Sequence, residues 1–239
     1  MKILYEDGEI IVVIKPAGMD AQSSRGLEKD MVSELKNHLA VSNREPYLGI
    51  VHRLDKPVEG IMVFAKSKKA AAVLSRDFQG QDIKKRYLAL VHGCPSRKEG
   101  ELFHFIRRNA VLQKAEIFEQ KEKDAKEALL SYKLLDMKKR DSLVLSILGI
   151  ELFTGRFHQI RAQLAYCGMP IWGDKKYHPD FAREEKRRGI GLAAVGLEFF
   201  HPKSGKRLVF SYTPEGEIWN FLENGNEKSI AEAAGDMIY

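Results

Sequence analysis

Residues 49–67 read GIVHRLDKPVEGIMVFAKS, and they place four polar side chains between two apolar runs. Both runs are rich in the aliphatic and β-branched residues that are typical of core strands. The four polar side chains between them are His52, Arg53, Asp55 and Lys56. Pro57 has a fixed φ angle and restricts the residue before it, so it helps to hold the loop after the carboxylate in one conformation. An aspartate held in this way can act as a nucleophile or a general base. The alternative is an aspartate that caps a turn beside a surface arginine.

A second residue with possible chemistry lies in KKRYLALVHG, residues 84–93. This segment alternates like a strand, with Tyr87, Ala89 and Val91 on one face. Tyr87 is then either the flat partner on which a base stacks or a core aromatic at strand spacing. The pattern alone leaves both readings open.

A third residue with possible chemistry, Arg161, lies in TGRFHQIRAQLAYCG, residues 154–168. Apolar residues at helical spacing predict a helix here, with Thr154 as a possible N-cap and with His158 and Arg161 near its start. An unpaired buried arginine is very costly, so Arg161 either reaches water or meets an acid such as Asp55.

The remaining segments alternate irregularly between strands and helices. Helical spacing predicts one helix over residues 27–40 and another over 67–80, which begins after Ser67 as its N-cap and stops at Gly80. A short helix is expected over residues 215–224. Strands are expected in a hairpin over residues 1–15, then at 47–55, 59–66, 128–137, 142–152 and 208–214.

This pattern favours one α+β domain with a mixed, largely antiparallel sheet and flanking helices over a doubly wound fold. The chain has no internal repeat, low-complexity block or long linker. We therefore expect a single domain over residues 1–225 and a peripheral tail over 226–239. The highly charged residues 107–127 predict a solvated loop or hairpin rather than a dedicated RNA-binding arm.

Composition narrows the class of protein. A chain of 239 residues with 44% hydrophobic residues can bury a substantial core. No run approaches the roughly 18 apolar residues of a membrane span, and the N-terminus turns acidic too early for a secretory signal, so a cytoplasmic protein is expected. Lys and Arg outnumber Asp and Glu by 39 to 33, which suits a polyanionic partner.

Several chemistries lack their usual sequence anchors. Cys94 and Cys167 are too few for a disulfide framework and lack metal-ligand spacing, so we expect reduced thiols in or near the core and no metal. No Walker loop, GxGxxG, GxSxG or HExxH motif is present. Nucleotide-dependent, serine-hydrolase and common zinc-protease activities are therefore not indicated.

Taken together, three segments resemble the successive signature motifs of the RluA-type RNA pseudouridine synthases. They are residues 49–67, residues 84–93 and TGRFHQIRAQLAYCGMPIWGDKKY at 154–177. The resemblance also includes VIKPAGM at 13–19 and LEFFHPKSGKRLVF at 197–210, so it covers most of residues 3–215 in the family's order. Three ordered motifs over a hundred residues are far more specific than HRLD alone.

The resemblance implies a catalytic trio. Asp55 matches the catalytic aspartate at the end of HRLD, and Tyr87 matches the family tyrosine that packs against the target uracil. Arg161 matches the arginine whose guanidinium pairs with that aspartate. Such a pair favours the ionised carboxylate and fixes its orientation.

The resemblance also implies the reaction and the partner. The pseudouridine synthase fold has a central RNA-binding cleft, and the reaction moves uracil from an N1 to a carbon 5 linkage without a cofactor. Because the base must first leave its stack, we expect structured stem-loop RNA as the substrate, with ribosomal RNA slightly favoured over transfer RNA. No membrane and no obligate protein partner is inferred.

Five further residues are candidates for RNA contacts. Arg53 either fills the vacated stack or has a phosphate-binding or structural role. Backbone contacts, which would make binding salt-dependent, are expected from Lys15, Lys56, Arg156 and His158.

The sequence also departs from the family pattern. Val58 and Glu59 stand where the family usually has two hydroxyl residues, and Ala194 stands where many members have histidine. KPAGM begins at residue 15, so we expect no accessory RNA-binding domain ahead of the catalytic one. The alternatives to an enzyme are a non-catalytic RNA-binding or assembly protein on the same fold and a structural domain with a basic surface. The retained trio favours the enzyme, because a binding module needs no such set.

Overall fold

The computed structural model describes residues 1–23, 29–40, 45–80, 82–140, 142–181, 189–220 and 230–236. Its strands are β1 (Lys2–Glu6), β2 (Ile10–Lys15), β3 (Gly49–Ile50), β4 (Glu59–Ala65), β5 (Lys84–His92), β6 (Glu99–Asn109), β7 (Lys114–Phe118), β8 (Lys126–Arg140), β9 (Leu143–Leu152), β10 (Leu192–Phe200) and β11 (Arg207–Ser211). Its helices are α1 (Met31–Leu39), α2 (Lys68–Gln79), α3 (Gln159–Tyr166), α4 (Glu217–Asn220) and α5 (Ile230–Asp236), with a 3₁₀ turn at Pro179–Phe181.

Within these ranges the strands form one sheet in the order β1-β2-β4-β10-β5-β9-β8-β6-β7, with β3 beside β4 and β11 beside β10. Strand pairing is antiparallel except between β4 and β10, which run parallel. The predicted α+β fold with a mixed, largely antiparallel sheet is therefore confirmed. The charged segment 107–127 forms the hairpin of β6 and β7 and the turn that follows it.

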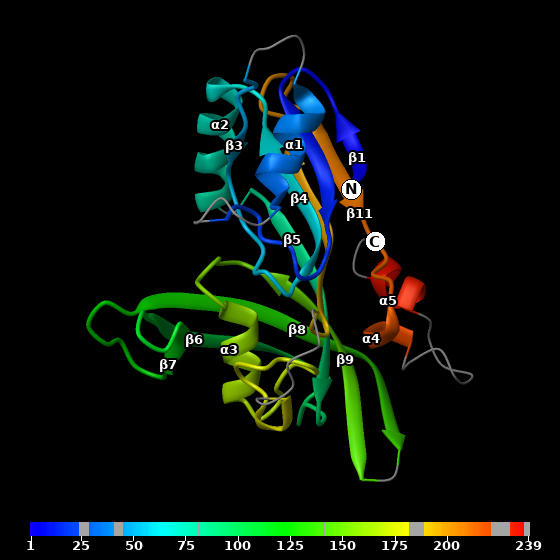
Figure 1. The fold of residues 1–239 in the computed structure, drawn as a ribbon. Helices are drawn as coiled ribbons and strands as arrows, with labels where there is room; N and C mark the ends of the chain where they lie inside the picture. The colour runs from blue at the N-terminus through cyan, green and yellow to red at the C-terminus, as the bar shows by residue number, and fades with distance from the viewer. Residues whose placement is uncertain are drawn as a thin grey trace.

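The alternation of side chains along β5 explains how the sheet is covered. Tyr87, Ala89 and Val91 belong to a core that also contains residues of α1 and α3. Leu88 and Leu90 point to the opposite face, where they pack with residues of α4 and α5. Figure 1 shows α1 and α3 on one side of the ribbon and α4 and α5 on the other. The two-residue period of the strand therefore separates the helices onto two faces.

The C-terminal tail is less peripheral than expected. Ala233 and Ala234 of α5 are buried against the sheet, in the same cluster as Trp219 of α4. Small apolar side chains let this short helix lie close to the sheet. The charged residues around it in the sequence gave no indication of this packing. The predicted helix over 215–224 is described only as α4, and residues 221–224 lie outside the described ranges.

Two predicted helices begin later than their sequence patterns suggest. Residues 27 and 28 lie outside the described ranges, and α1 begins at Met31 because Asp30 and Ser33 form a reciprocal capping box. α3 begins at Gln159 rather than after Thr154, whose Oγ1 accepts from the N–H of Leu129 at 2.9 Å and donates to the side chain of Gln159. By contrast, α2 has the predicted Ser67 cap and stops before Gly80.

The strand expected over residues 47–55 is reduced to β3, and residues 51–58 form a loop. A turn closes this loop, because the N–H of Val58 donates to the carbonyl of Asp55 at 3.0 Å. Gly60 then has a φ of +128°, and a Cβ atom there would lie 2.3 Å from the carbonyl oxygen of Ala194. Only glycine allows β4 and β10 to approach this closely, so Gly60 fixes where the loop returns to the sheet.

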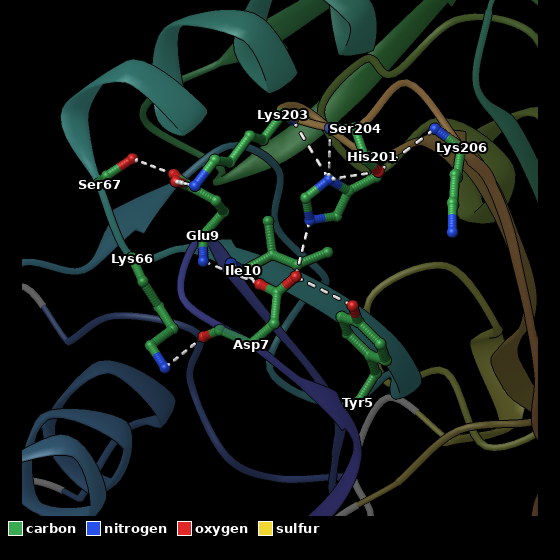
Figure 2. Close-up of polar contacts among 10 residues, drawn as sticks. All are labelled: Tyr5, Asp7, Glu9, Ile10, Lys66, Ser67, His201, Lys203, Ser204 and Lys206. Atoms are coloured by element: carbon green, nitrogen blue, oxygen red, sulfur yellow. Dashed lines mark hydrogen bonds and ion pairs between the residues drawn. The ribbon is translucent and has the colours of Figure 1, made fainter.

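A polar network ties the first hairpin to the turn after β10 (Figure 2). Asp7 Oδ2 accepts from Tyr5 at 2.9 Å and lies 2.8 Å from Nε2 of His201, while its Oδ1 accepts from two backbone N–H groups. On the other side of the ring, Nδ1 of His201 accepts from the N–H of Ser204 at 3.0 Å. The network joins segments that lie 194 positions apart in the chain. Among the described residues no helix is long and apolar enough to cross a membrane.

Candidate active site

The loop between β3 and β4 places Asp55 at a pocket of about 330 Å³. Other walls come from β5, from the segment before α3 and from α3 itself. Six of the eight predicted site residues line this pocket: Arg53, Asp55, Tyr87, Arg156, His158 and Arg161. The fold thus brings together residues from all three motifs.

Arg161 lies between two carboxylates. Its Nη1 donates to Oδ2 of Asp55 at 2.9 Å, while Nε and Nη2 donate to the two oxygens of Asp174 at 2.7 and 2.8 Å. Asp174 is fully buried, so the bidentate pair satisfies a charge that could not otherwise be buried at this place. Burial opposes the charged form of Arg161, but the two carboxylates outweigh it and raise the pKa of the guanidinium.

Asp174 was missed by the sequence reasoning. It lies in the GDKKY string of the third motif, and a carboxylate there was a visible candidate partner for a buried arginine. Its Oδ1 also accepts from the N–H of Lys176 at 3.0 Å, which fixes the turn that follows β-bridge residue Ile171. Asp174 therefore holds Arg161 in place, and Arg161 in turn contacts Oδ2 of Asp55.

Tyr87 lies on β5 and is 8% exposed, at the wall of the pocket. Burial, with a smaller effect of Asp55, raises the pKa of its hydroxyl, so the ring is neutral at physiological pH. Tyr87 is therefore both a core aromatic and a pocket residue. The two readings of this tyrosine are compatible.

His158 lies directly beside the carboxylate. Its Nε2 is 3.6 Å from Oδ2 of Asp55, and its Nδ1 is 3.0 Å from the hydroxyl of Tyr177. Burial lowers the pKa of His158 to about 4, so the ring is neutral at physiological pH. A neutral imidazole carries no positive charge, so at this place His158 can act only through hydrogen bonds and its dipole.

Lys15 lies outside the pocket lining. Its side chain is fully buried, and Nζ donates to the carbonyl oxygens of Pro16, Met19 and Lys56 at 3.0, 2.8 and 3.2 Å. Burial lowers the pKa of Lys15 to about 8. In this position the ammonium holds the loop that carries Asp55. Lys56 lies outside the pocket lining, with Nζ 3.1 Å from Asp20.

Positive charge at the pocket comes from three other side chains. Arg53 is exposed, and Arg156 is partly exposed with its Nε donating to the carbonyl of Glu127 at 2.7 Å. Lys85, which the sequence reasoning missed, also lines the pocket and is 9% exposed. Burial, and then the nearby Arg156, lowers the pKa of Lys85. Its place two residues before Tyr87, on the same strand face, was the available signal.

The departures from the family pattern lie in different places. Val58 is buried and lines the pocket, whereas the side chain of Glu59 lies outside the lining. Glu59 accepts from the hydroxyl of Tyr212 and from the indole N–H of Trp219, both at 2.7 Å. Ala194 is buried in the core. Glu59 therefore anchors the C-terminal segment.

One group of possible metal ligands occurs among the described residues, away from the pocket lining. Donor atoms of His92, His178 and Asp180 lie within 4.8 Å of one another. Nδ1 of His92 and Nε2 of His178 are 3.1 Å apart, the distance of a hydrogen-bonded pair.

Cys94 and Cys167 are free and exposed rather than in the core, because they follow β5 and α3 at surface turns.

The geometry suits chemistry by an oriented carboxylate. Asp55 is 27% exposed, is held from one side by Arg161 and faces a pocket that also contains an aromatic wall. Such a carboxylate can act as a nucleophile or a base on a flat ligand that enters the pocket.

Comparison with known proteins gives consistent matches. The family described as RNA pseudouridylate synthase matches residues 9–166. A protein of Aquifex aeolicus (strain VF5) described as an uncharacterized RNA pseudouridine synthase is 35% identical over 93% of this chain and 73% of its own length. Ribosomal large subunit pseudouridine synthase C of Buchnera aphidicola subsp. Acyrthosiphon pisum is 30% identical over 92% and 69%. The solved structure of Human RNA Pseudouridylate Synthase Domain Containing 1 has a similar fold, with a TM-score of 0.73 and 23% identity over 90% of this chain and 83% of that one.

Proposed function

The chain belongs to the RNA pseudouridylate synthase family and is an RNA pseudouridine synthase, and from this premise we propose that it isomerises particular uridines of structured RNA with Asp55 as its essential aspartate. The observation that carries the proposal is the 2.9 Å contact between Asp55 and Arg161 at the wall of a pocket that Tyr87 also lines. The resemblance in sequence assigned a catalytic role to these three residues.

The reaction is an isomerisation with no net oxidation or reduction. The bond between uracil N1 and ribose carbon 1 breaks, the base turns within the pocket, and a new bond joins carbon 5 to the same ribose carbon. A proton leaves carbon 5 and N1 gains one, so the atoms balance without a cofactor. Asp55 acts either as a nucleophile on the base or the ribose, or as a base in a route through a glycal.

Each member of the trio has a separate role in this proposal. Arg161 orients the Asp55 carboxylate, because a bidentate contact with Asp174 fixes the guanidinium. Tyr87 offers an apolar, neutral ring against which the flat uracil packs. Holding the base at a fixed angle to the carboxylate lowers the entropic part of the barrier.

The substrate class follows from access to the pocket. Uracil reaches Asp55 only after it leaves its stack, which costs a few kcal/mol and is easiest in loops and bulges. Arg53 and Arg156 lie at the same pocket and suit contacts with the flanking backbone or the vacated stack. Lys56 is a further candidate for such contacts, outside the lining.

We favour ribosomal RNA over transfer RNA as the substrate. The support is the Buchnera relative, which is described as a ribosomal large subunit pseudouridine synthase and is similar over most of both chains. We also propose that residues 1–225 work as one catalytic domain in the cytoplasm.

The test is a transcriptome-wide chemical map of pseudouridine in cells that lack the protein. The cells are complemented with the wild type or with Asp55→Asn. The proposal expects one or a few uridines, in a ribosomal RNA, to lose their modification and to regain it only with the wild type. Restoration by Asp55→Asn would contradict the role of the aspartate, and loss at transfer RNA positions alone would contradict the preference for ribosomal RNA.

A further inference from the structure

The two oxygens of the Asp55 carboxylate have different surroundings. Nη1 of Arg161 lies 2.9 Å from Oδ2, and Nε2 of His158 lies 3.6 Å from the same oxygen. Within the described part of the chain, no side chain or backbone N–H donates a hydrogen bond to Oδ1. One oxygen is therefore held by its neighbours, and the other is available to a ligand.

Tyr177 lies behind His158 and limits how the imidazole can carry its proton. The hydroxyl oxygen of Tyr177 accepts from the N–H of Ala115 at 2.7 Å and lies 3.0 Å from Nδ1 of His158. Because this oxygen already accepts from an amide, the single proton of the hydroxyl is best directed to a lone pair on Nδ1. A neutral His158 then carries its own proton on Nε2, the nitrogen that faces Asp55.

The surroundings of the ring favour the same tautomer. The pKa of His158 falls to about 4 because burial outweighs the attraction of Asp55, while Arg161 and Lys176 also disfavour a second proton and Asp174 favours it. A neutral ring with the opposite tautomer would point a lone pair at a carboxylate oxygen, which is repulsive. The ring is also fixed in place by Phe157, whose centroid lies 3.8 Å away in a stacked arrangement.

We propose that Tyr177 and His158 are positioning residues: Tyr177 fixes the Nε2–H tautomer of His158, which acts with Arg161 on Oδ2 of Asp55 and leaves Oδ1 as the oxygen presented to the uridine. At 3.6 Å the imidazole acts as an oriented dipole, since this separation exceeds a normal hydrogen bond. The inference rests on the proposed role of Asp55. It adds a function for the HQIR histidine and for a tyrosine outside the trio.

The chain of contacts also reaches the β6–β7 hairpin. Ala115, which donates to Tyr177, belongs to β7, and Nζ of Lys176 donates to the carbonyl of Gln113 in the hairpin turn at 2.8 Å. The hairpin extends from the body of the protein (Figure 1). The contact between Ala115 of this hairpin and Tyr177 is therefore part of the arrangement that orients His158.

Two substitutions of His158 separate positioning from a purely structural role. His158 has a φ of +52°, a left-handed conformation in which asparagine is much better tolerated than glutamine. The amide nitrogen of glutamine reaches the position of Nε2 and keeps a donor toward Asp55, whereas the shorter asparagine reaches only the position of Nδ1. A structural role thus favours His158→Asn, and the positioning role favours His158→Gln.

The assay uses purified full-length protein and total RNA from cells that lack it. Initial rates of pseudouridine formation are measured over a range of RNA concentrations. We expect His158→Gln to keep kcat within about threefold, and His158→Asn and Tyr177→Phe to lose about tenfold or more, with KM changed less than twofold. Tyr166→Phe, which removes a surface hydroxyl of α3 that donates to Glu119, is the matched control and should leave kcat unchanged.

A second measurement does not depend on activity. Nitrogen-15 spectra of histidine-labelled protein report which ring nitrogen of His158 carries the proton. The proposal expects Nε2–H in the wild type and a mixed or reversed tautomer in Tyr177→Phe. A wild-type Nδ1–H tautomer, or an Asn variant as active as the Gln variant, would overturn it. Absence of pseudouridine formation by the wild type on any RNA would instead count against the proposed function, while the spectra would still decide the tautomer.

Discussion

Asp55 and Arg161 lie 106 positions apart in the chain, yet their side chains meet at 2.9 Å. Asp55 comes from the loop before β4 and Arg161 from the first turn of α3, and the sheet holds the two at a fixed separation. Because Arg161 is anchored by Asp174 on its other side, the contact does not depend on the mobility of a long side chain. The position of the carboxylate is therefore set by the core of the protein.

Replacing Asp55 by asparagine keeps the shape and removes the charge. We expect kcat to fall by at least about 10²–10⁴-fold, because in the proposed function this group acts directly on the substrate as nucleophile or base. RNA affinity, measured by filter binding, should change little. A variant with wild-type turnover on the mapped substrate would contradict the assigned role.

Arg161→Lys should destabilise the fold as well as the site. A single ammonium cannot reproduce the bidentate contact with Asp174 and the bond to Asp55 together, so a buried charge loses its partner. We expect the free energy of unfolding, from urea titration, to fall by about 3–5 kcal/mol. Asp174→Asn is the matched variant and should lose a similar amount. An unchanged midpoint in both would show that the pair adds no stability.

Glu59→Thr restores a hydroxyl residue of the kind the family usually has at this position. The substitution leaves the hydroxyl of Tyr212 and the buried indole N–H of Trp219 without their acceptor. We expect a loss of about 1–3 kcal/mol in the free energy of unfolding and a change in tryptophan fluorescence. Activity below the unfolding temperature should stay within about threefold, since Glu59 lies outside the pocket lining. A change in the set of modified uridines would instead tie this residue to substrate choice.

Acid should weaken the fold through His52. Its Nε2 accepts from the N–H of Val63 at 3.1 Å, and burial lowers its pKa to about 3. Between pH 6.5 and 4 the unfolded chain therefore binds a proton that the folded chain does not, so stability falls as the pH falls. His52→Gln keeps an acceptor and does not titrate.

The comparison of these two proteins isolates that effect, because the other titrating groups are shared. Urea titrations at pH 7, 5.5 and 4 should show a steeper loss for the wild type than for His52→Gln, by up to about 3 kcal/mol at pH 4. Parallel losses would mean that His52 accepts a proton in the folded state.

The sequence was most informative where local patterns decide structure. The cap and stop of α2 follow from Ser67 and Gly80, and the alternation along β5 gave the two faces of the sheet correctly. The start of α3 was mispredicted because Thr154 bonds to Leu129, a residue of a strand far away in sequence. The helix propensity of a segment carries no information about a hydrogen-bond partner that only the tertiary fold brings near.

The candidate site divides in the same way. Motif identity pointed to Asp55, Tyr87 and Arg161, and the need for a carboxylate partner followed from the cost of burying a guanidinium. The positions of Lys15 and His158 were not predictable, since a basic side chain near a motif can face either RNA or the interior. Burial and hydrogen-bond partners decide between these, and both depend on the whole fold.

The arginine held between two carboxylates also determines which part of a nucleotide can approach it. With both carboxylates ionised, one positive and two negative charges leave the buried group with an excess of one negative charge. A phosphate is repelled from this floor, while a neutral base and its sugar are not. Arg53, Arg156 and Lys85, which line the same pocket, carry the opposite charge. If the proposed function holds, the pocket should therefore admit the neutral base and sugar of a nucleotide and favour a position of its phosphates near these cations.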